Sequence, residues 1–206
     1  MPTMDKPTKK YYATRAAEIS RLYRQGEGGV SAHFAEAFPE GSRVLEIGAG
    51  SGRDLCRLLE AGYDACGIDA SEEMTANAIR EYPRLEGRCI TGEVPSNTLF
   101  FGGEFDGILC SAVLMHLPDD QAQRAAESMG NNLKQGGTLL LSVPLQRPDI
   151  DATNRSRDGR LFVLRPSEYY EELFEKTGFT CMRTIREEDG LGRAGYHWLI
   201  MFFCKK

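Results

Sequence analysis

The stretch Val44-Leu45-Glu46-Ile47-Gly48-Ala49-Gly50-Ser51-Gly52-Arg53-Asp54 decides the fold of this chain. Its first four residues have strand character, three alternate glycines follow, and leucines then recur with helical spacing from residue 55 to residue 59. A strand, a tight glycine turn and a helix N-terminus form the ligand-binding corner of a doubly wound α/β sheet. We expect Gly48 and Gly50 to let the backbone approach a ligand, and Gly52 to let the helix pack close to the strand.

Two charged residues in this stretch narrow the class of ligand. Arg53 stands where the G-x-G-x-x-G pattern of a dinucleotide-binding fold has its last glycine, and Glu46 stands two places before the first glycine. A carboxylate at the end of the strand repels a pyrophosphate, whereas it attracts a cationic amino-acid group. The corner therefore favours a cationic ligand over a dinucleotide.

Outward from this corner, strands and helices alternate, which predicts a parallel sheet with right-handed crossovers. After residue 166 the order changes to one helix and two strands that a charged, glycine-containing loop joins, which predicts a C-terminal antiparallel hairpin. The expected strands are 43–47, 65–68, 88–91, 105–111, 138–143, 179–186 and 197–204, and the expected helices are 52–61, 71–82, 119–133 and 167–177.

The N-terminal forty residues have a different character. The first ten are polar and predict a loosely attached start, and apolar residues then follow helical spacing from Tyr11 to Tyr23. Gly26, Gly28 and Gly29 interrupt this helix, and a second short helix is expected over 31–38 with Ser31 as its N-cap. We expect residues 1–40 to form a helical segment that precedes a core of residues 41–206.

Length and composition limit the class of protein. A chain of 206 residues with 41% hydrophobic and 27% charged residues is typical of a single globular domain, here 1–206. The net charge of −5 disfavours wholesale binding to nucleic acid or to an anionic membrane. No signal peptide is visible at the N-terminus, and the longest apolar run, 198–204, is too short to span a bilayer.

The six cysteines occur without a C-x-x-C pair and mostly within apolar runs. This pattern favours buried thiols in a cytoplasmic protein over a zinc site or a disulfide framework.

An acidic residue ends the second expected strand. Asp69 lies 17 residues beyond Gly52, where a doubly wound fold holds the ribose diol of an adenosine ligand. Dehydrogenases also use an acid here, so Asp69 supports adenosine without choosing the cofactor, and a turn aspartate is the alternative.

The corner with Glu46 and Arg53 resembles motif I of the class I S-adenosylmethionine-dependent methyltransferases. Residues 105–118 are similar to that family's motif IV region, and 133–140 resemble the turn before its fifth strand. The resemblance extends from Val44 to Val143 in the expected order. It implies a mainly parallel seven-stranded sheet with helices on both faces, S-adenosylmethionine as cofactor and S-adenosylhomocysteine as product.

The resemblance also implies which residues contact the cofactor. Glu93 would meet the adenine amino group, with a surface glutamate as the alternative, and Met74 would flank the ring unless it is helix core. The implied cofactor-binding residues are Glu46, Gly48, Ala49, Gly50, Gly52, Asp69, Ala70, Met74, Gly92, Glu93, Val94, Ser111 and Ala112.

The acceptor is less clearly indicated. His116 follows the fourth strand and is a candidate for proton transfer, against a role in packing or capping. The loop 144–165 carries five arginines, which suggest recognition of a carboxylate or phosphate unless internal ion pairs neutralise them. The N-terminal helix beginning Tyr11-Tyr12 resembles the lid that many small-molecule methyltransferases fold over the cofactor, and Tyr12 or Arg15 of this lid would then touch the cofactor.

Methyl transfer to a small acceptor, anionic if the arginine loop binds it, is the leading hypothesis. Methylation of a protein or RNA is the alternative within the same chemistry. A second alternative is a non-catalytic protein that binds the cofactor and acts through partners. An NAD-linked oxidoreductase is disfavoured by Arg53, Glu46 and the C-terminal hairpin.

Overall fold

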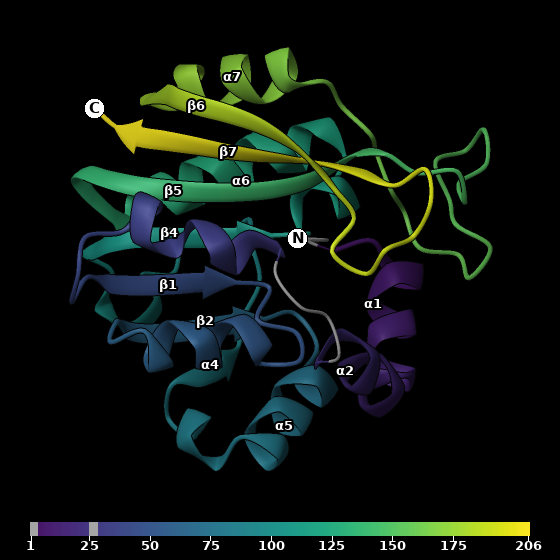
Figure 1. Ribbon diagram of the computed structural model, residues 1–206, viewed down its shortest axis with the longest axis horizontal. Helices are drawn as coiled ribbons and strands as arrows, with labels where there is room; N and C mark the ends of the chain where they lie inside the picture. The colour runs from purple at the N-terminus through teal and green to yellow at the C-terminus, as the bar shows by residue number, and fades with distance from the viewer. Residues whose placement is uncertain (1–3, 25–28) are drawn as a thin grey trace.

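The computed structural model describes residues 4–24 and 29–206. Seven strands of these residues form one sheet in the order β3-β2-β1-β4-β5-β7-β6 (Figure 1). The strands are β1 (Arg43–Ile47), β2 (Asp64–Asp69), β3 (Cys89–Thr91), β4 (Phe105–Ser111), β5 (Leu133–Gln146), β6 (Phe179–Glu188) and β7 (His197–Lys205). The helices are α1 (Lys6–Thr14), α2 (Ala16–Arg24), α3 (Phe34–Ala37), α4 (Arg53–Glu60), α5 (Glu72–Glu81), α6 (Asp119–Asn132) and α7 (Ser167–Lys176). Four 3₁₀ turns complete the described elements: η1 (Gly29–His33), η2 (Pro83–Leu85), η3 (Phe100–Gly102) and η4 (Leu114–His116).

The sheet has the predicted architecture. Strands β1 to β5 pair in parallel, and β7 inserts antiparallel between β5 and β6. The C-terminal hairpin is thereby confirmed. The strand order reverses between β1 and β4, and such a switch point opens a crevice at the carboxyl ends of the strands.

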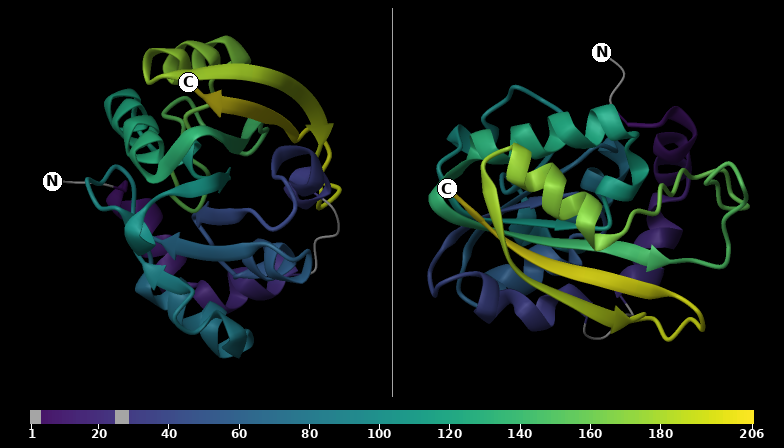
Figure 2. Two further views of the ribbon diagram at one scale, coloured as in Figure 1. Left: turned by 90° about the vertical axis from the view of Figure 1, so that its left-hand side faces the viewer. Right: turned by 90° about the horizontal axis from the view of Figure 1, so that it is seen from above.

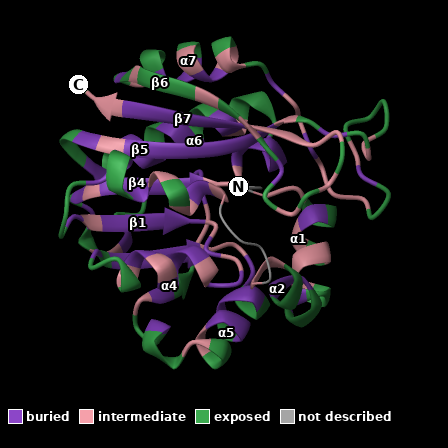
Figure 3. Ribbon diagram, in the orientation of Figure 1, coloured by how far each residue is buried: buried purple, intermediate pink, exposed green. Residues whose placement is uncertain are grey.

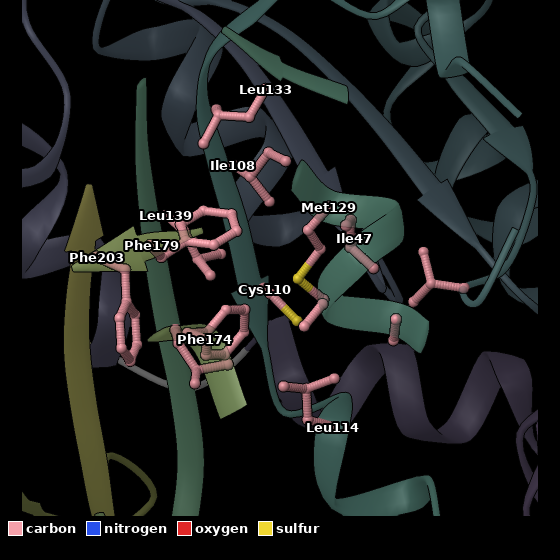
Figure 4. Packing of buried hydrophobic residues seen from close by; sticks show 14 of the residues in the cluster. Ile47, Ile108, Cys110, Leu114, Met129, Leu133, Leu139, Phe174, Phe179 and Phe203 are labelled. Atoms are coloured by element: carbon pink, nitrogen blue, oxygen red, sulfur yellow. The ribbon is translucent and has the colours of Figure 1, made fainter. Parts of the chain in front are cut away.

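Helices cover both faces of the sheet (Figure 2). Because side chains alternate along a strand, Leu45 and Ile47 of β1 face one layer while Val44 faces the other. The first layer holds α6 and α7, and Figure 4 shows Met129 and Phe174 packed against strand residues there. The second layer holds α3, α4 and α5. The central strands are therefore buried on both sides (Figure 3), as a mainly parallel sheet requires.

The expectation of buried thiols holds for the four cysteines of α4, β2, β3 and β4 but not for those of β6 and β7. Cys56, Cys66, Cys89 and Cys110 are free and buried, whereas Cys181 and Cys204 are half-buried.

Several boundaries were predicted correctly from local signals. Gly52 is the N-cap of α4, and Gly62 follows its end with a positive φ of 88°. Ser71 caps α5, because its hydroxyl accepts from the backbone N–H of Met74. Strand β5 is longer than the expected 138–143, because β7 pairs with it as far as Gln146.

The N-terminal expectations were partly wrong. The predicted loose segment is already helical at Lys6, because Asp5 caps α1 by accepting from the Thr8 N–H, and Thr8 is buried. The single expected helix is two helices that separate at Arg15, whose conformation is not helical. Ser31 lies inside the 3₁₀ turn η1 and does not cap α3.

The glycine break falls mostly outside the described residues, since Gly26 and Gly28 lie there.

Candidate functional site

A cavity of about 300 Å³ lies at the carboxyl ends of β1, β2 and β4. Residues of α1 and α2 line it together with the segments that follow β5 and β6. Beneath the lid, Met74 packs with Ala16 and Ile19, so α2 rests on α5. In Figure 1, α1 and α2 lie beside the end of the sheet toward which the arrowheads of β1 and β4 point. The crevice at the switch point is therefore roofed by the N-terminal helices.

The glycine turn forms one wall of this cavity. Gly48 has a φ of 79°, and an added Cβ would lie 2.3 Å from Cγ2 of Val113. Gly50, with a φ of 53°, has no atom closer than 3.7 Å to such a Cβ, so a Cβ there would make only ordinary van der Waals contacts. Both glycines and Ala49 line the cavity, as expected.

Gly52 has another role than the predicted one. It does not line the cavity, and its added Cβ would lie 2.7 Å from Leu85 and 3.1 Å from Ala78. Close packing of α4 against α5 and η2, rather than against a strand or a ligand, therefore requires this glycine.

Glu46 lines the cavity and has a buried, unpaired carboxylate oxygen. The residue is 3% exposed, and its Oε2 has no hydrogen-bond partner among residues 4–24 and 29–206. Burial raises the pKa of Glu46 well above its usual value, and the Asp54 carboxylate raises it further, although Arg53 opposes the shift. A cation that entered the cavity here would satisfy this oxygen.

Asp69 braces the glycine turn. Its Oδ2 accepts from the Gly50 N–H at 2.8 Å, and its Oδ1 accepts from the Ser71 N–H at 2.9 Å. Burial raises the pKa of Asp69, while these two N–H donors oppose the rise. The carboxylate therefore links β2 to the turn after β1, and it also lines the cavity.

The other residues expected to contact the cofactor also line the cavity. They include Glu93, which pairs with Lys9 of the lid at 3.7 Å. Ala112 has a positive φ of 58°, an uncommon conformation for a residue with a side chain. The set is Ala70, Met74, Gly92, Glu93, Val94, Ser111 and Ala112.

Arg53, where a dinucleotide fold has glycine, closes a corner of the cavity. Its guanidinium pairs with Asp54 at 2.8 Å and donates to the backbone carbonyl of Tyr23 at 2.9 Å. This side chain therefore ties α4 to the end of the lid helix α2.

An aromatic–arginine cluster, comprising Tyr12, His116, Arg147, Arg160 and Phe162, lines another part of the cavity. The Phe162 ring centre lies 3.7 Å from the Arg147 guanidinium and 4.8 Å from the His116 ring centre. The Tyr12 hydroxyl lies 3.1 Å from His116 Nε2. His116 is 3% exposed, and burial lowers its pKa to about 4.

The five arginines of the loop divide into two groups. Arg147 and Arg160 line the cavity and pair with Asp149 and Asp158. The others are not part of the cavity lining. Arg155 pairs with Asp5, the buried Arg165 holds Asp119 and two backbone carbonyls, and Arg157 is exposed. Internal ion pairs therefore account for most of the loop, and two guanidinium groups remain at the site.

The lid contributes more than its expected contacts. Tyr12 lines the cavity, whereas Arg15 is exposed and pairs with Glu18. The structure adds Tyr11, Tyr23 and Leu22 to the lining, and the segment after β6 adds Asp189. Helical spacing identified these tyrosines as apolar positions, but it contained no signal of what they cover.

Two further classes of feature are absent from the described chain. No group of histidine, cysteine and acidic side chains in the ranges 4–24 and 29–206 is suited to hold a metal ion. No helix within these ranges is long and apolar enough to cross a membrane.

Residues 21–184 match a family model described as a methyltransferase domain. The ubiquinone biosynthesis O-methyltransferase of Methylococcus capsulatus is 32% identical over 145 residues, which cover 68% of this chain but only 54% of that protein. An uncharacterized methyltransferase of Bacillus cytotoxicus is 29% identical over 171 residues, covering 73% of this chain and 77% of the relative.

Solved structures share the fold. The 1,6-didemethyltoxoflavin-N1-methyltransferase of Burkholderia thailandensis, solved with 1,6-didemethyltoxoflavin and S-adenosylhomocysteine, superposes with a TM-score of 0.74 at 23% identity. That match covers 97% of this chain and 88% of the other. The magnesium protoporphyrin IX methyltransferase of Synechocystis PCC 6803, solved with S-adenosylhomocysteine, superposes with a TM-score of 0.73 at 17% identity. That match covers 96% of this chain and 98% of the other.

Proposed function

This chain belongs to the class I S-adenosylmethionine-dependent methyltransferases, and from that premise we propose that it methylates a small acceptor that carries an anionic group. Its cofactor, S-adenosylmethionine, supplies a methyl carbon that the adjoining sulfonium activates toward a nucleophile. The ubiquinone-pathway and didemethyltoxoflavin enzymes named above, whose names specify small acceptors, support this choice.

The carboxylate side of the cavity fits this cofactor. The unpaired Glu46 Oε2 would accept from the ammonium, and Gly50, which lines the cavity without a Cβ, would let the ligand chain approach the backbone. Asp69 would hold the ribose diol. Glu93 would release Lys9 and accept a hydrogen bond from the adenine amino group instead. The residues that would hold the cofactor are Glu46, Gly48, Ala49, Gly50, Asp69, Ala70, Met74, Gly92, Glu93, Val94, Ser111 and Ala112, without Gly52.

The observation that carries the acceptor proposal is the pair of guanidinium groups in the aromatic–arginine cluster. Arg147 uses Nε and Nη2 for Asp149, and Arg160 uses Nε and Nη2 for Asp158. Within residues 4–24 and 29–206, each therefore keeps its Nη1 edge, and the Nη1 of Arg160 makes one contact there, at 3.5 Å from the Tyr12 hydroxyl. A carboxylate or similar anion on an aromatic acceptor would bind these edges while its ring packs against Phe162.

In-line displacement depends mainly on alignment and on the exclusion of water. Tyr11, Tyr12 and Tyr23 of the lid line the cavity and would exclude water over the bound pair. A protein or RNA acceptor, the alternative, would require α1 and α2 to leave this position. The closed lid therefore favours a small molecule.

Titration calorimetry with S-adenosylmethionine, S-adenosylhomocysteine and NAD tests the first half of the proposal. We expect micromolar binding of the first two and none of NAD. A radiolabelled methyl-transfer screen then compares aromatic carboxylates and phosphates with their neutral analogues, and with RNA and protein.

Two variants, Arg147→Gln and Arg160→Gln, test whether these guanidinium groups bind the anion of the acceptor. Each should raise the KM for an anionic acceptor about tenfold or more while cofactor affinity is unchanged, because one charge-assisted hydrogen bond is worth about 1.5–3 kcal/mol. Arg157→Gln, in the same loop but exposed and outside the cavity, is the matched control. Methylation of neutral acceptors only, or of RNA, would refute the anionic small-molecule proposal.

A further inference from the structure

The hydrogen bond between Tyr12 and His116 has a fixed direction. His116 Nδ1 lies 2.6 Å from the backbone carbonyl oxygen of Leu161, which can only accept. Nδ1 therefore carries the hydrogen, and in a neutral imidazole Nε2 then presents a lone pair. It follows that the Tyr12 hydroxyl, 3.1 Å away, donates to Nε2.

The surroundings keep this imidazole neutral. Burial is the largest cause of its low pKa, and the nearby cations Arg160 and Arg147 add to it. The Leu161 carbonyl and the Asp5 carboxylate oppose the shift without reversing it. Tyr12 faces His116 from α1, and burial raises the pKa of its phenol, so both partners stay uncharged at neutral pH.

Tyr12 also has accepting capacity left on the cavity side. A phenol oxygen can accept hydrogen bonds in addition to donating one. Among the described residues, the side chains near this oxygen are Arg160, whose Nη1 lies at the long distance of 3.5 Å, and Tyr23, with which Tyr12 also shares a hydrogen bond. Because Tyr12, His116 and Arg160 all line the cavity, an acceptor whose anion contacts Arg160 would lie within reach of the Tyr12 hydroxyl.

We propose that Tyr12 and His116 form a proton relay for the methyl acceptor, whose nucleophile is a hydroxyl or amine that donates to the Tyr12 oxygen. The inference rests on the proposed function. As the acceptor's lone pair forms its bond to the methyl carbon, the carbon–sulfur bond breaks and its electron pair stays on sulfur. The acceptor's proton passes to the Tyr12 oxygen, and the Tyr12 proton passes to His116 Nε2. The resulting imidazolium keeps its Nδ1–H on Leu161.

A weakly basic imidazole is sufficient for this step. The nucleophile gains positive charge as the new bond forms, so its proton becomes strongly acidic only at that stage. His116 therefore accepts the proton late, and the same low basicity makes it release the proton to solvent before the next cycle. This order requires no charged base in the resting enzyme.

The first test needs no acceptor. In protein with ¹⁵N-labelled histidine, we expect the His116 ring to show a protonated Nδ1 and an unprotonated Nε2 from about pH 6 to pH 8. Tyr12→Phe should shift the Nε2 resonance while the tautomer is retained, and His116→Gln identifies the signal among the three histidines. A protonated Nε2 would overturn the relay by itself, because the phenol could not then donate.

The second test separates proton transfer from lid closure. Tyr12→Phe should lower kcat about 100-fold, within the usual range for one proton-transfer group, and leave the Kd for S-adenosylmethionine within about twofold. The loss should shrink along a series of acceptors of increasing acidity, since an already ionised nucleophile needs no relay. Tyr169→Phe, whose hydroxyl contacts Asp119 away from the cavity, is the control.

The outcomes distinguish the two proposals. A wild-type enzyme that binds the cofactor but methylates no small acceptor refutes the proposed function and the relay with it. Wild-type turnover with an unchanged kcat in Tyr12→Phe, a change in KM alone, or an equal loss for every acceptor refutes the relay only.

Discussion

Glu46→Gln should make the protein more stable and its cofactor affinity lower. The substitution keeps the shape of a buried side chain whose Oε2 has no hydrogen-bond partner in the described part of the chain. It removes a charge that burial and the Asp54 and Asp69 carboxylates disfavour. It also removes the anion that we propose pairs with the cofactor's ammonium.

The stability effect depends on pH with a definite sign. Because the folded protein holds the Glu46 proton more tightly than the unfolded chain does, wild-type stability falls as pH rises from the usual glutamate range through the raised pKa of Glu46. The variant lacks this loss. We expect it to be more stable by about 1–3 kcal/mol at pH 8, the cost of leaving a buried charge unpaired, because the glutamine amide is equally unpaired but uncharged, and by less at pH 5.

For a domain of this size that gain corresponds to a Tm higher by about 2–10 °C. Loss of a charge-assisted contact of about 1.5–3 kcal/mol should weaken S-adenosylmethionine about 10- to 150-fold. Thermal melts at the two pH values and titration calorimetry measure both effects, and Glu72→Gln, at an exposed site in α5, is the control. Equal cofactor affinity, or a Tm gain that is no larger at pH 8 than at pH 5, would refute the reasoning.

Three further changes test other parts of the site. Asp69→Ala should weaken S-adenosylmethionine about tenfold or more, because it removes the proposed diol contact and the brace on Gly50, and calorimetry showing unchanged affinity would contradict both roles. Gly50→Val should abolish cofactor binding, since its side chain would occupy space at the cavity wall, and should lower the Tm modestly because of the positive φ of 53°, whereas Gly48→Val should lower the Tm further through its clash with Val113. Asp5→Asn should increase hydrogen exchange in α1, because Arg155 and the Thr8 donors hold the pKa of Asp5 at about 2 despite burial. In the wild type, the stabilisation from the Asp5–Arg155 ion pair should be present above the usual aspartate pKa and be lost as pH falls toward 2. Equal hydrogen exchange of α1 in both proteins at neutral pH would show that this pair does not anchor the lid.

Local patterns predicted most of the fold because the elements of the core follow local rules. The glycine corner, the Ser71 cap and the loop between the last two strands each depend on residues a few positions apart. The carboxylates Glu46 and Asp69 were identifiable for the same reason, since each ends a strand whose place in a parallel sheet is determined by chain order.

The predictions failed where the outcome depends on distant partners. The helicity of residues 6–10 depends on Thr8, whose hydroxyl accepts from the Leu161 N–H, 153 positions away. Gly52 was assigned to the ligand because its motif suggests that role, but its neighbours Ala78 and Leu85 come from a later helix and turn. Nothing in the spacing of the loop arginines indicated that only Arg147 and Arg160 would line the cavity.

The sequence by itself determined the strands and helices of the core, the mainly parallel sheet with its C-terminal hairpin, and the acidic, glycine-walled side of the cavity, because strand periodicity and turn chemistry act over short distances. Only the tertiary structure decided the acceptor side, where Tyr12 and His116 meet across 104 positions and two arginines keep an edge for a ligand. Hydrogen-bond direction, burial and the pairing of charges are properties of groups brought together by packing. They have no signature in the residues that precede or follow them.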